Sequence, residues 1–191
     1  MNNETLIQAE NIAFKINGNK LFHNLSFALE KGEALQIVGS NGSGKSTLIR
    51  IILGITKQTK GNVNYKNSIN VSYLGHKNAL KTYLSVYDNL MLQELNNHKE
   101  LNILLERLEL KNFLDVTVGN LSYGQQKKLA MLRVFLNESN LIVLDEPFVG
   151  LDSKAFDIVQ DFLIKEINSG KSLIFTSHID CNIESKILNL R

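Results

Sequence analysis

Short apolar runs separated by turn residues divide the first third of the chain into β-like segments. Loose alternation of apolar and polar positions over 5–8, 11–16 and 25–29, with a turn signal at Asn17-Gly18-Asn19, predicts an N-terminal antiparallel sheet. The next run, 34–38, is apolar at almost every position, which is typical of a buried strand.

The middle of the chain changes from a two-residue to a helical period. Two more short β runs, 61–65 and 70–74, precede a block over 77–118 that we expect to be mostly helical. Ser85-Val86-Tyr87-Asp88 resembles a capping box, and leucines at 101, 104, 105 and 108 share one helix face. With the next helix this block predicts a helical subdomain of about 77–134.

The last part alternates predicted helices and strands. The run 141–144 is apolar on every residue, as in a central parallel strand covered on both faces. A helix over 154–167 and strands at 171–176 and 186–190 follow. The sequence therefore predicts an α/β fold in a single domain over 1–191. We expect a mostly parallel sheet, an N-terminal antiparallel β subdomain and a small helical insert.

Composition narrows the class of protein. The 191 residues are 43% hydrophobic with a net charge of +2, and the scattered Lys and Arg give no reason to expect nucleic-acid binding or a polybasic anchor. Neither a signal peptide nor a membrane-spanning stretch is expected. The single cysteine, Cys181, fits a reducing compartment, and the four dispersed histidines predict no structural metal.

One loop carries the strongest chemical signal. It consists of Gly39, Ser40, Asn41, Gly42, Ser43, Gly44, Lys45, Ser46 and Thr47 and fits G-x-x-x-x-G-K-[ST]. It follows a predicted strand and precedes the apolar run 48–53, a predicted helix that ends at Gly54. Gly42 and Gly44 let the backbone approach phosphate. Lys45 adds a cation, and Ser46 offers a hydroxyl to Mg²⁺. The loop predicts a P-loop NTPase core rather than an ordinary glycine-rich turn.

Two carboxylates follow the apolar strand, where open α/β sheets bind ligands. Asp145 is placed to hold Mg²⁺, and Glu146 to accept a proton from the water that attacks the γ-phosphate. Helix capping is the alternative, and Pro147, which stiffens the turn, argues against it. His178 follows the next core strand in the same way, so it is a candidate for the same phosphate, although a lone histidine is more often structural.

A second helix start could also hold an anion. Ser122 is a good N-cap before the apolar run 129–136, although most capped helices bind nothing. Phe14 is the best candidate for stacking on an adenine face, and an ordinary core position is an equally good interpretation of it.

The order of these motifs resembles the ATP-binding cassette family of ATPases over essentially the whole chain. The resemblance implies ATP and Mg²⁺ as cofactors, Glu146 as general base and His178 as a γ-phosphate contact. It also implies a head-to-tail homodimer with Asp152 at the dimer contact. In that dimer Ser122, Gly124 and Gln125 would reach the ATP held by the other subunit. Tyr123 stands where the family usually has Gly.

Local segments resemble the ATP-binding subunits of haem exporters in cytochrome c maturation. They are 73–77, 80–82, 89–90, Leu21-Phe22, the loop residues Ser40-Asn41-Gly42 and the run Gln125-Gln126-Lys127-Lys128. This resemblance implies a peripheral protein on the cytoplasmic face of the bacterial inner membrane, bound to integral-membrane transporter subunits, with no nucleic acid and no direct haem contact. The family's magnesium-ligating glutamine is replaced here by His76, which leaves that ligand in doubt.

Other functions share these motifs. A DNA-repair or chromosome ATPase would need a far longer insert than 77–118, and a translation-associated cassette protein would need two cassettes. A non-hydrolysing scaffold conflicts with the intact Glu146. An exporter subunit for another substrate remains the main alternative to haem export.

Overall fold

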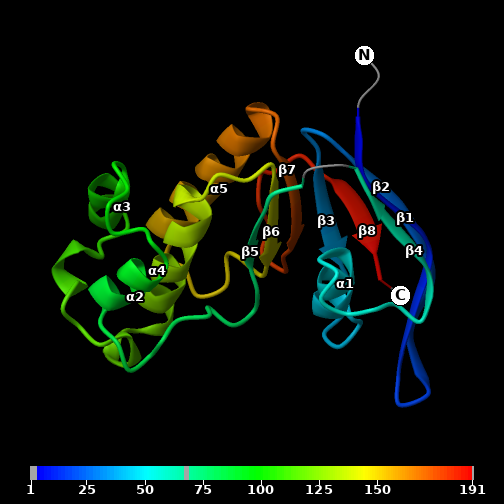
Figure 1. The fold of residues 1–191 in the computed structure, drawn as a ribbon, viewed down its shortest axis with the longest axis horizontal. Helices are drawn as coiled ribbons and strands as arrows, with labels where there is room; N and C mark the ends of the chain where they lie inside the picture. The colour runs from blue at the N-terminus through cyan, green and yellow to red at the C-terminus, as the bar shows by residue number, and fades with distance from the viewer. Residues whose placement is uncertain (1–3, 67–68, 191) are drawn as a thin grey trace.

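The computed structural model describes residues 4–66 and 69–190. Its strands form two sheets, one antiparallel with the order β2-β1-β4 and one with the order β5-β6-β7-β3-β8. In Figure 1 the antiparallel sheet lies on the right, the parallel sheet in the centre, and the short helices α2 and α3 on the left. The predicted α/β fold, with an antiparallel β part and a helical insert, is confirmed.

The antiparallel sheet is built from the N-terminal hairpin. Strands β1 (Thr5–Ile16) and β2 (Asn19–Glu30) pair, and β4 (Lys60–Tyr65) lies on the other side of β1. The two runs predicted before the turn form one strand, interrupted by a register shift near Asn11, whose φ is 50°. Asn17 and Gly18 both have positive φ, as a two-residue hairpin turn requires.

All neighbouring strands of the five-stranded sheet are parallel. They are β3 (Ala34–Val38), β5 (Val71–Leu74), β6 (Leu141–Asp145), β7 (Ser172–Thr176) and β8 (Lys186–Asn189). Every residue of β6 and β7 is buried. The continuous apolar runs of these strands therefore match the covered centre of the sheet, as predicted.

Three longer helices have clear sequence signals at their ends. They are α1 (Lys45–Ile52), α4 (Tyr123–Leu136) and α5 (Ser153–Asn168). Helix α1 ends in a Schellman motif, in which Gly54 N donates to Ile51 O and Ile55 N donates to Arg50 O. Gly54 follows the cap with φ 69°, which explains why the helix stops there.

The block 77–118 contains less helix than the sequence predicted. It holds α2 (Val86–Leu92) and α3 (Leu101–Arg107), with 3₁₀ turns at Lys111–Phe113 and Val118–Asn120. The Ser85 capping box is present. Part of the remaining backbone is held by a side chain, because the buried Asn89 bonds the Lys81 N–H and carbonyl and the Ser85 carbonyl. Such bonds stabilise loops, and the leucine pattern does not reveal them.

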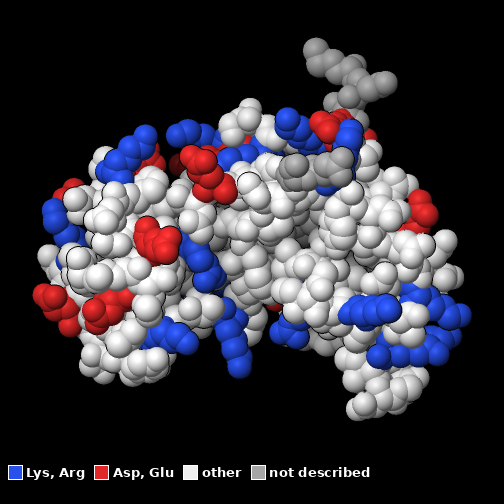
Figure 2. Space-filling view, viewed as in Figure 1, with Lys and Arg blue, Asp and Glu red and all other residues white. Residues whose placement is uncertain are grey.

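The distribution of basic side chains on the surface differs between the two ends of the molecule. Figure 2 shows basic side chains gathered where Figure 1 places the antiparallel sheet. In that sheet Lys15 is opposite Lys20 in the β1–β2 register. The hairpin thus places these two lysines side by side. Over residues 4–66 and 69–190 we find no helix with the length and apolarity needed to span a bilayer.

Candidate functional site

The glycine-rich loop joins β3 to α1 at the carboxyl end of the parallel sheet. Gly42 and Gly44 have φ of 84° and 101°, and Gly44 is the residue before α1. A side chain on Gly39 would lie 2.5 Å from Ser43 Oγ and 2.9 Å from the Leu190 carbonyl oxygen. The loop therefore needs glycine both for its backbone conformation and for its tight packing.

Lys45 lies at the centre of this end of the sheet. Its Nζ donates to Gly39 O at 2.8 Å and to Ser40 O at 3.3 Å. It also lies 3.0 Å from His178 Nε2. Lys45 is only 9% exposed. The structure thus brings together the lysine and the histidine that the sequence placed on separate elements.

The end of β6 is joined to the end of β7 by a hydroxyl that the sequence analysis did not single out. Thr176 Oγ1 donates to Asp145 Oδ1 at 2.8 Å and accepts from Glu146 N at 2.8 Å. Thr176 is fully buried. A threonine that ends an otherwise apolar strand, next to a strand ending in Asp-Glu, is the signal that could have revealed it.

Glu146 has a left-handed backbone conformation and a carboxylate that can accept a further hydrogen bond. Its φ is 53°, which is uncommon for a residue with a side chain and is frequent at functional sites. Oε2 accepts from the His178 N–H at 3.3 Å. Oε1 is buried, has no hydrogen-bond partner among the described residues, and lies 3.4 Å from His178 Nε2. A buried carboxylate oxygen that lacks a donor is well suited to a water molecule.

These groups surround one hollow, which we call the carboxyl-end hollow. Its volume is about 480 Å³, and its lining combines the loop, the ends of several strands and three apolar side chains: Ile16, Leu21, Asn41, Gly42, Gly44, Lys45, Ser46, Thr47, His76, Asp145, Glu146, Val149 and His178. His76 is present, but Phe14 is not. Phe14 instead stacks on Phe22, with ring centroids 6.3 Å apart, so the core interpretation of Phe14 is the one that the structure favours.

The donors in this hollow fit a hard cation. Ser46 offers a hydroxyl and Asp145 a carboxylate, and Mg²⁺ is usually held by one or two protein oxygens together with phosphate and water. Within the described ranges no cluster of three or more His, Cys, Asp or Glu could hold a metal alone. The residues therefore fit Mg²⁺ that arrives with a nucleotide rather than a metal cage made only of protein.

A buried lysine on α4 is a second feature that sequence reasoning missed. Lys127 is 1% exposed and is one of the largest fully buried side chains among the described residues. Burial lowers the pKa of Lys127, while the negative charges of Asp145 and Glu146 act to raise it. Lysine is rarely buried so deeply without a role for its charge. The doubled Lys127-Lys128 just before an apolar run is the pattern that could have drawn attention to it.

The signature turn, residues 121–125, lies at the start of α4 and outside the lining of this hollow. Ser122 caps the helix through Gln125 N at 3.2 Å, and Gln125 Oε1 accepts from Ser122 N at 2.9 Å. This is a complete capping box. None of the residues 121–125 belongs to the lining of the carboxyl-end hollow. Within one chain the turn and the phosphate loop therefore do not line the same hollow.

Asp152 has two partners in its own chain. Its Oδ1 accepts from Ala155 N at 2.8 Å and caps α5, and its Oδ2 lies 2.6 Å from Lys128 Nζ. The hydrogen bond from Lys128 holds the pKa of Asp152 below its ordinary value, and the bond from Ala155 adds to this shift. The side chain remains 54% exposed, so it is still accessible to a partner.

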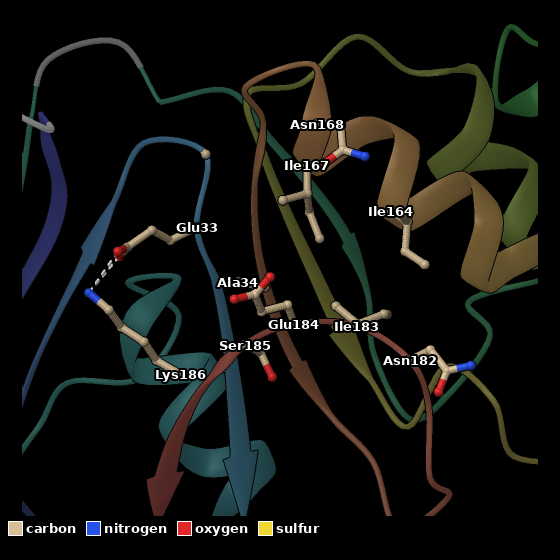
Figure 3. A pocket seen from close by; sticks show the side chains of 11 residues that line it. Glu33, Ala34, Ile164, Ile167, Asn168, Asn182, Ile183, Glu184, Ser185 and Lys186 are labelled. Carbon is tan, nitrogen blue, oxygen red and sulfur yellow. Dashed lines mark hydrogen bonds and ion pairs between the residues drawn. The ribbon is translucent and has the colours of Figure 1, made fainter. Parts of the chain in front are cut away.

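A second hollow lies at the other end of the parallel sheet. This amino-end hollow has a volume of about 610 Å³ and is lined by Gly32, Glu33, Ala34, Ile164, Ile167, Asn168, Asn182, Ile183, Glu184, Ser185 and Lys186. Figure 3 shows the isoleucines of α5 on one side and the Glu33–Lys186 pair on the other. It contains none of the residues that the sequence motifs singled out.

Comparison with known proteins gives a consistent result. Residues 22–149 match the family described as ABC transporter. A protein of Idiomarina loihiensis named "Cytochrome c biogenesis ATP-binding export protein CcmA" is 33% identical over 92% of this chain and 87% of its own length. The protein of the same name from Nitrosococcus oceani is 34% identical over 93% and 88%.

Solved structures share the fold. One is an ATP-binding cassette solved as a dimer in a post-hydrolysis state bound to ADP and Pi. It superposes with a TM-score of 0.83 at 24% identity and covers 97% of this chain and 94% of its own. Another is the ATP-binding subunit of an ABC transporter, with a TM-score of 0.82 at 22% identity, covering 97% and 86%. At this identity the likeness supports the fold alone.

Proposed function

Because the chain belongs to the ABC transporter family of ATP-hydrolysing subunits, we propose that it drives haem export for the maturation of c-type cytochromes. The observation that carries the hydrolytic part is the convergence of Lys45, His178 and Glu146 at one end of the parallel sheet. The export part rests on the similarity to proteins named for cytochrome c biogenesis and export.

The proposed reaction is in-line transfer of the γ-phosphoryl group of ATP to water. The loop N–H groups and Lys45 hold the β- and γ-phosphates, and His178 contacts the γ-phosphate. Glu146 Oε1, which has no hydrogen-bond partner, accepts the proton of the attacking water as the bond to the β-phosphate oxygen breaks. Ser46 and Asp145 would hold Mg²⁺, which would supply positive charge to offset that of the phosphate oxygens. His76 lines the same hollow and is a further candidate ligand.

The second step of the proposal is closure of a head-to-tail homodimer over ATP. The signature turn does not line the hollow around the phosphate loop of its own chain, so Ser122, Gly124 and Gln125 would act on the ATP of the other copy. The positive end of α4 favours phosphate. Asp152, half exposed at the end of the loop that begins at Glu146, would lie at the contact. Hydrolysis would then reopen the dimer.

The membrane partner would dock on the helical block. Tyr83 is 74% exposed, and Tyr87 and Met91 on α2 are 44% and 49% exposed. Apolar side chains of this size on one face are typical of an interaction surface. We propose that membrane subunits bind this face and the segment 76–83, and that the protein lies peripherally on the cytoplasmic side of the inner membrane.

A complementation experiment tests the exported substrate. A bacterial strain that lacks its own relative of this chain receives the wild type, Lys45→Ala or Glu146→Gln together with the cognate membrane subunits. The wild type should restore covalent haem in periplasmic c-type cytochromes, and neither variant should. If the wild type hydrolyses ATP with these membrane subunits but c-type cytochromes stay haem-free, an exporter for another substrate becomes the better assignment.

A further inference from the structure

The first turn of α4 lies directly on the loop that joins β6 to α5. This loop, residues 146–152 (the catalytic loop), runs from Glu146 to the helix cap Asp152. A methyl group built on Gly150 would lie 2.4 Å from Cδ1 and 2.5 Å from Cε1 of Tyr123. A methyl group on Gly124 would lie 2.6 Å from the Gly150 carbonyl oxygen. Two successive residues of α4 thus press on one residue of the catalytic loop.

Gly150 lies between two anchored residues of the catalytic loop and has no side chain of its own. Phe148 is buried in the core, with its ring centroid 4.7 Å from that of Phe156, and Asp152 is tied to Lys128. Between these two anchors, Gly150 has φ 80° and no side chain to hold it. A hydrogen bond from Leu151 N to Phe148 O at 3.3 Å closes the turn that contains Gly150, and the ring of Tyr123 covers it from outside.

The contact is made by the ring and not by the hydroxyl. The atoms nearest to Gly150 are ring carbons, and the Tyr123 hydroxyl has no hydrogen-bond partner within the part of the chain that the structure describes. Tyr123 is 48% exposed, so one side of it covers Gly150 while the rest faces solvent. Rigid packing of this kind transmits displacement between elements that touch.

We propose that Tyr123 is a positioning residue for hydrolysis. Its ring fixes Gly150 against the signature turn, so that α4 and the catalytic loop move as one body within a chain. Displacement of Ser122 on contact with nucleotide is then passed to Glu146 four residues before Gly150. This inference rests on the proposed role of Glu146, because the consequence of the contact is the placement of that carboxylate.

Hydrogen exchange gives a test that does not depend on hydrolysis. The purified full chain is compared with Tyr123→Ala and Tyr123→Phe, and exchange is followed in peptides that cover 146–152. Tyr123→Ala should speed exchange there by about three-fold or more, because the cover over Gly150 is lost. Tyr123→Phe keeps the ring and should resemble the wild type. Unchanged exchange in Tyr123→Ala would overturn the proposal.

Steady-state kinetics test whether the contact between Tyr123 and Gly150 affects ATP hydrolysis. Tyr123→Ala should lower kcat by about ten-fold and change the KM for ATP by less than about two-fold, because small displacements of a catalytic group are costly. Tyr123→Phe should retain clearly more turnover than Tyr123→Ala. Equal loss in both variants would instead assign a role to the hydroxyl and contradict a ring contact. An unchanged melting temperature separates positioning from loss of fold.

A double-mutant cycle tests the pair itself. Gly150→Ala puts a methyl group into the Tyr123 ring and should cost more turnover in the wild type than in the Tyr123→Ala background, by about three-fold or more. Gly170→Ala is the matched control, because Gly170 has φ 95° and nothing within 4 Å of an added methyl group. Independent, multiplicative effects at 123 and 150 would refute the coupling. Full turnover in Glu146→Gln would refute the proposed base and leave the exchange result standing.

Discussion

The two ends of the parallel sheet each carry a hollow, and they differ in chemistry more than in size. The amino-end hollow, at about 610 Å³, is larger than the carboxyl-end hollow, at about 480 Å³. At the amino end Glu33 and Lys186 pair with each other at 2.8 Å. At the carboxyl end, Glu146 keeps a buried oxygen to which no described residue donates. We therefore base the proposed site on the unused hydrogen-bonding capacity among converging charges at the carboxyl end, rather than on the volume of either hollow.

Strand β7 reaches both ends and carries a buried hydroxyl at each. Ser172 Oγ accepts from Gly32 N at 3.0 Å and donates to Glu30 O at 3.1 Å, so it joins backbone to backbone. Thr176 Oγ1 has the same number of bonds, but one of its partners is the Asp145 carboxylate. The same kind of bridge supports a turn at one end and a reactive carboxylate at the other.

The largest expected effect is at Lys45. Lys45→Ala removes the cation from the phosphate loop, and hydrogen bonds to charged groups contribute about 1.5–3 kcal/mol each. We expect ATP affinity to fall by about 100-fold or more, as measured by titration calorimetry. Unchanged affinity would show that the glycine-rich loop does not hold the triphosphate.

Glu146→Gln should lower turnover and leave binding in place. General-base catalysis contributes about 10²–10⁴-fold, so we expect a loss of at least about 100-fold in phosphate release with ATP affinity retained. Full turnover by this variant would remove Glu146 as the base. The carboxyl end of the sheet would then no longer be distinguished by a catalytic carboxylate.

Thr176→Val and Ser172→Ala sharpen the comparison, because both variants remove a buried bridge. Each should lower the free energy of unfolding by about 1–3 kcal/mol, since buried groups lose a partner. Only Thr176→Val should also lower kcat, by about ten-fold, because Asp145 and Glu146 lose a shared support. Denaturant titration and phosphate release measure the two effects. Equal kinetic loss at Ser172 would contradict the division between the ends.

Substitution of Glu33 should have the smallest effect, which is a pH-dependent change in the free energy of unfolding. Burial alone would raise the pKa of Glu33, but the hydrogen bonds from Lys186 and the Glu30 N–H, with the charge of Lys186, leave it lowered. A lowered folded-state pKa stabilises the protein above the ordinary value of about 4.3. That stabilisation disappears as the pH falls through the lower, folded-state pKa.

The matching variant is Glu33→Gln. It should lower the free energy of unfolding by less than about 1 kcal/mol at pH 7. In acid, where Glu33 of the wild type is protonated in both the folded and the unfolded state, the two proteins should be equally stable. Its ATP turnover at pH 7 should equal that of the wild type. A destabilisation that persists below the folded-state pKa would mean that the ion pair is not its cause, and a lower turnover would tie the amino end to the chemistry.

The fold was largely predictable because its signals are local. Continuous apolar runs gave the buried strands, and Ser85, Ser122 and Gly54 marked helix ends that the structure confirms. The extent of helix in 77–118 was not predictable, because side-chain bonds such as those of Asn89 hold loops there.

The site was predictable where its residues follow a motif. The loop around Lys45 and the pair Asp145-Glu146 lie where strand ends place them. Thr176 and Lys127 were missed because their importance depends on what folding puts beside them. The contact between Tyr123 and Gly150 joins residues far apart in sequence, so no local pattern predicts it.

The central claim is that one chain supplies only part of the site and a second copy closes it. The most direct measurement is the molar mass of Glu146→Gln in solution with saturating ATP and Mg²⁺, by light scattering. We predict twice the 21.5 kDa of one chain with ATP, and the mass of a single chain after ATP is removed. A variant that binds ATP yet stays monomeric, both alone and with its membrane subunits, would contradict the account.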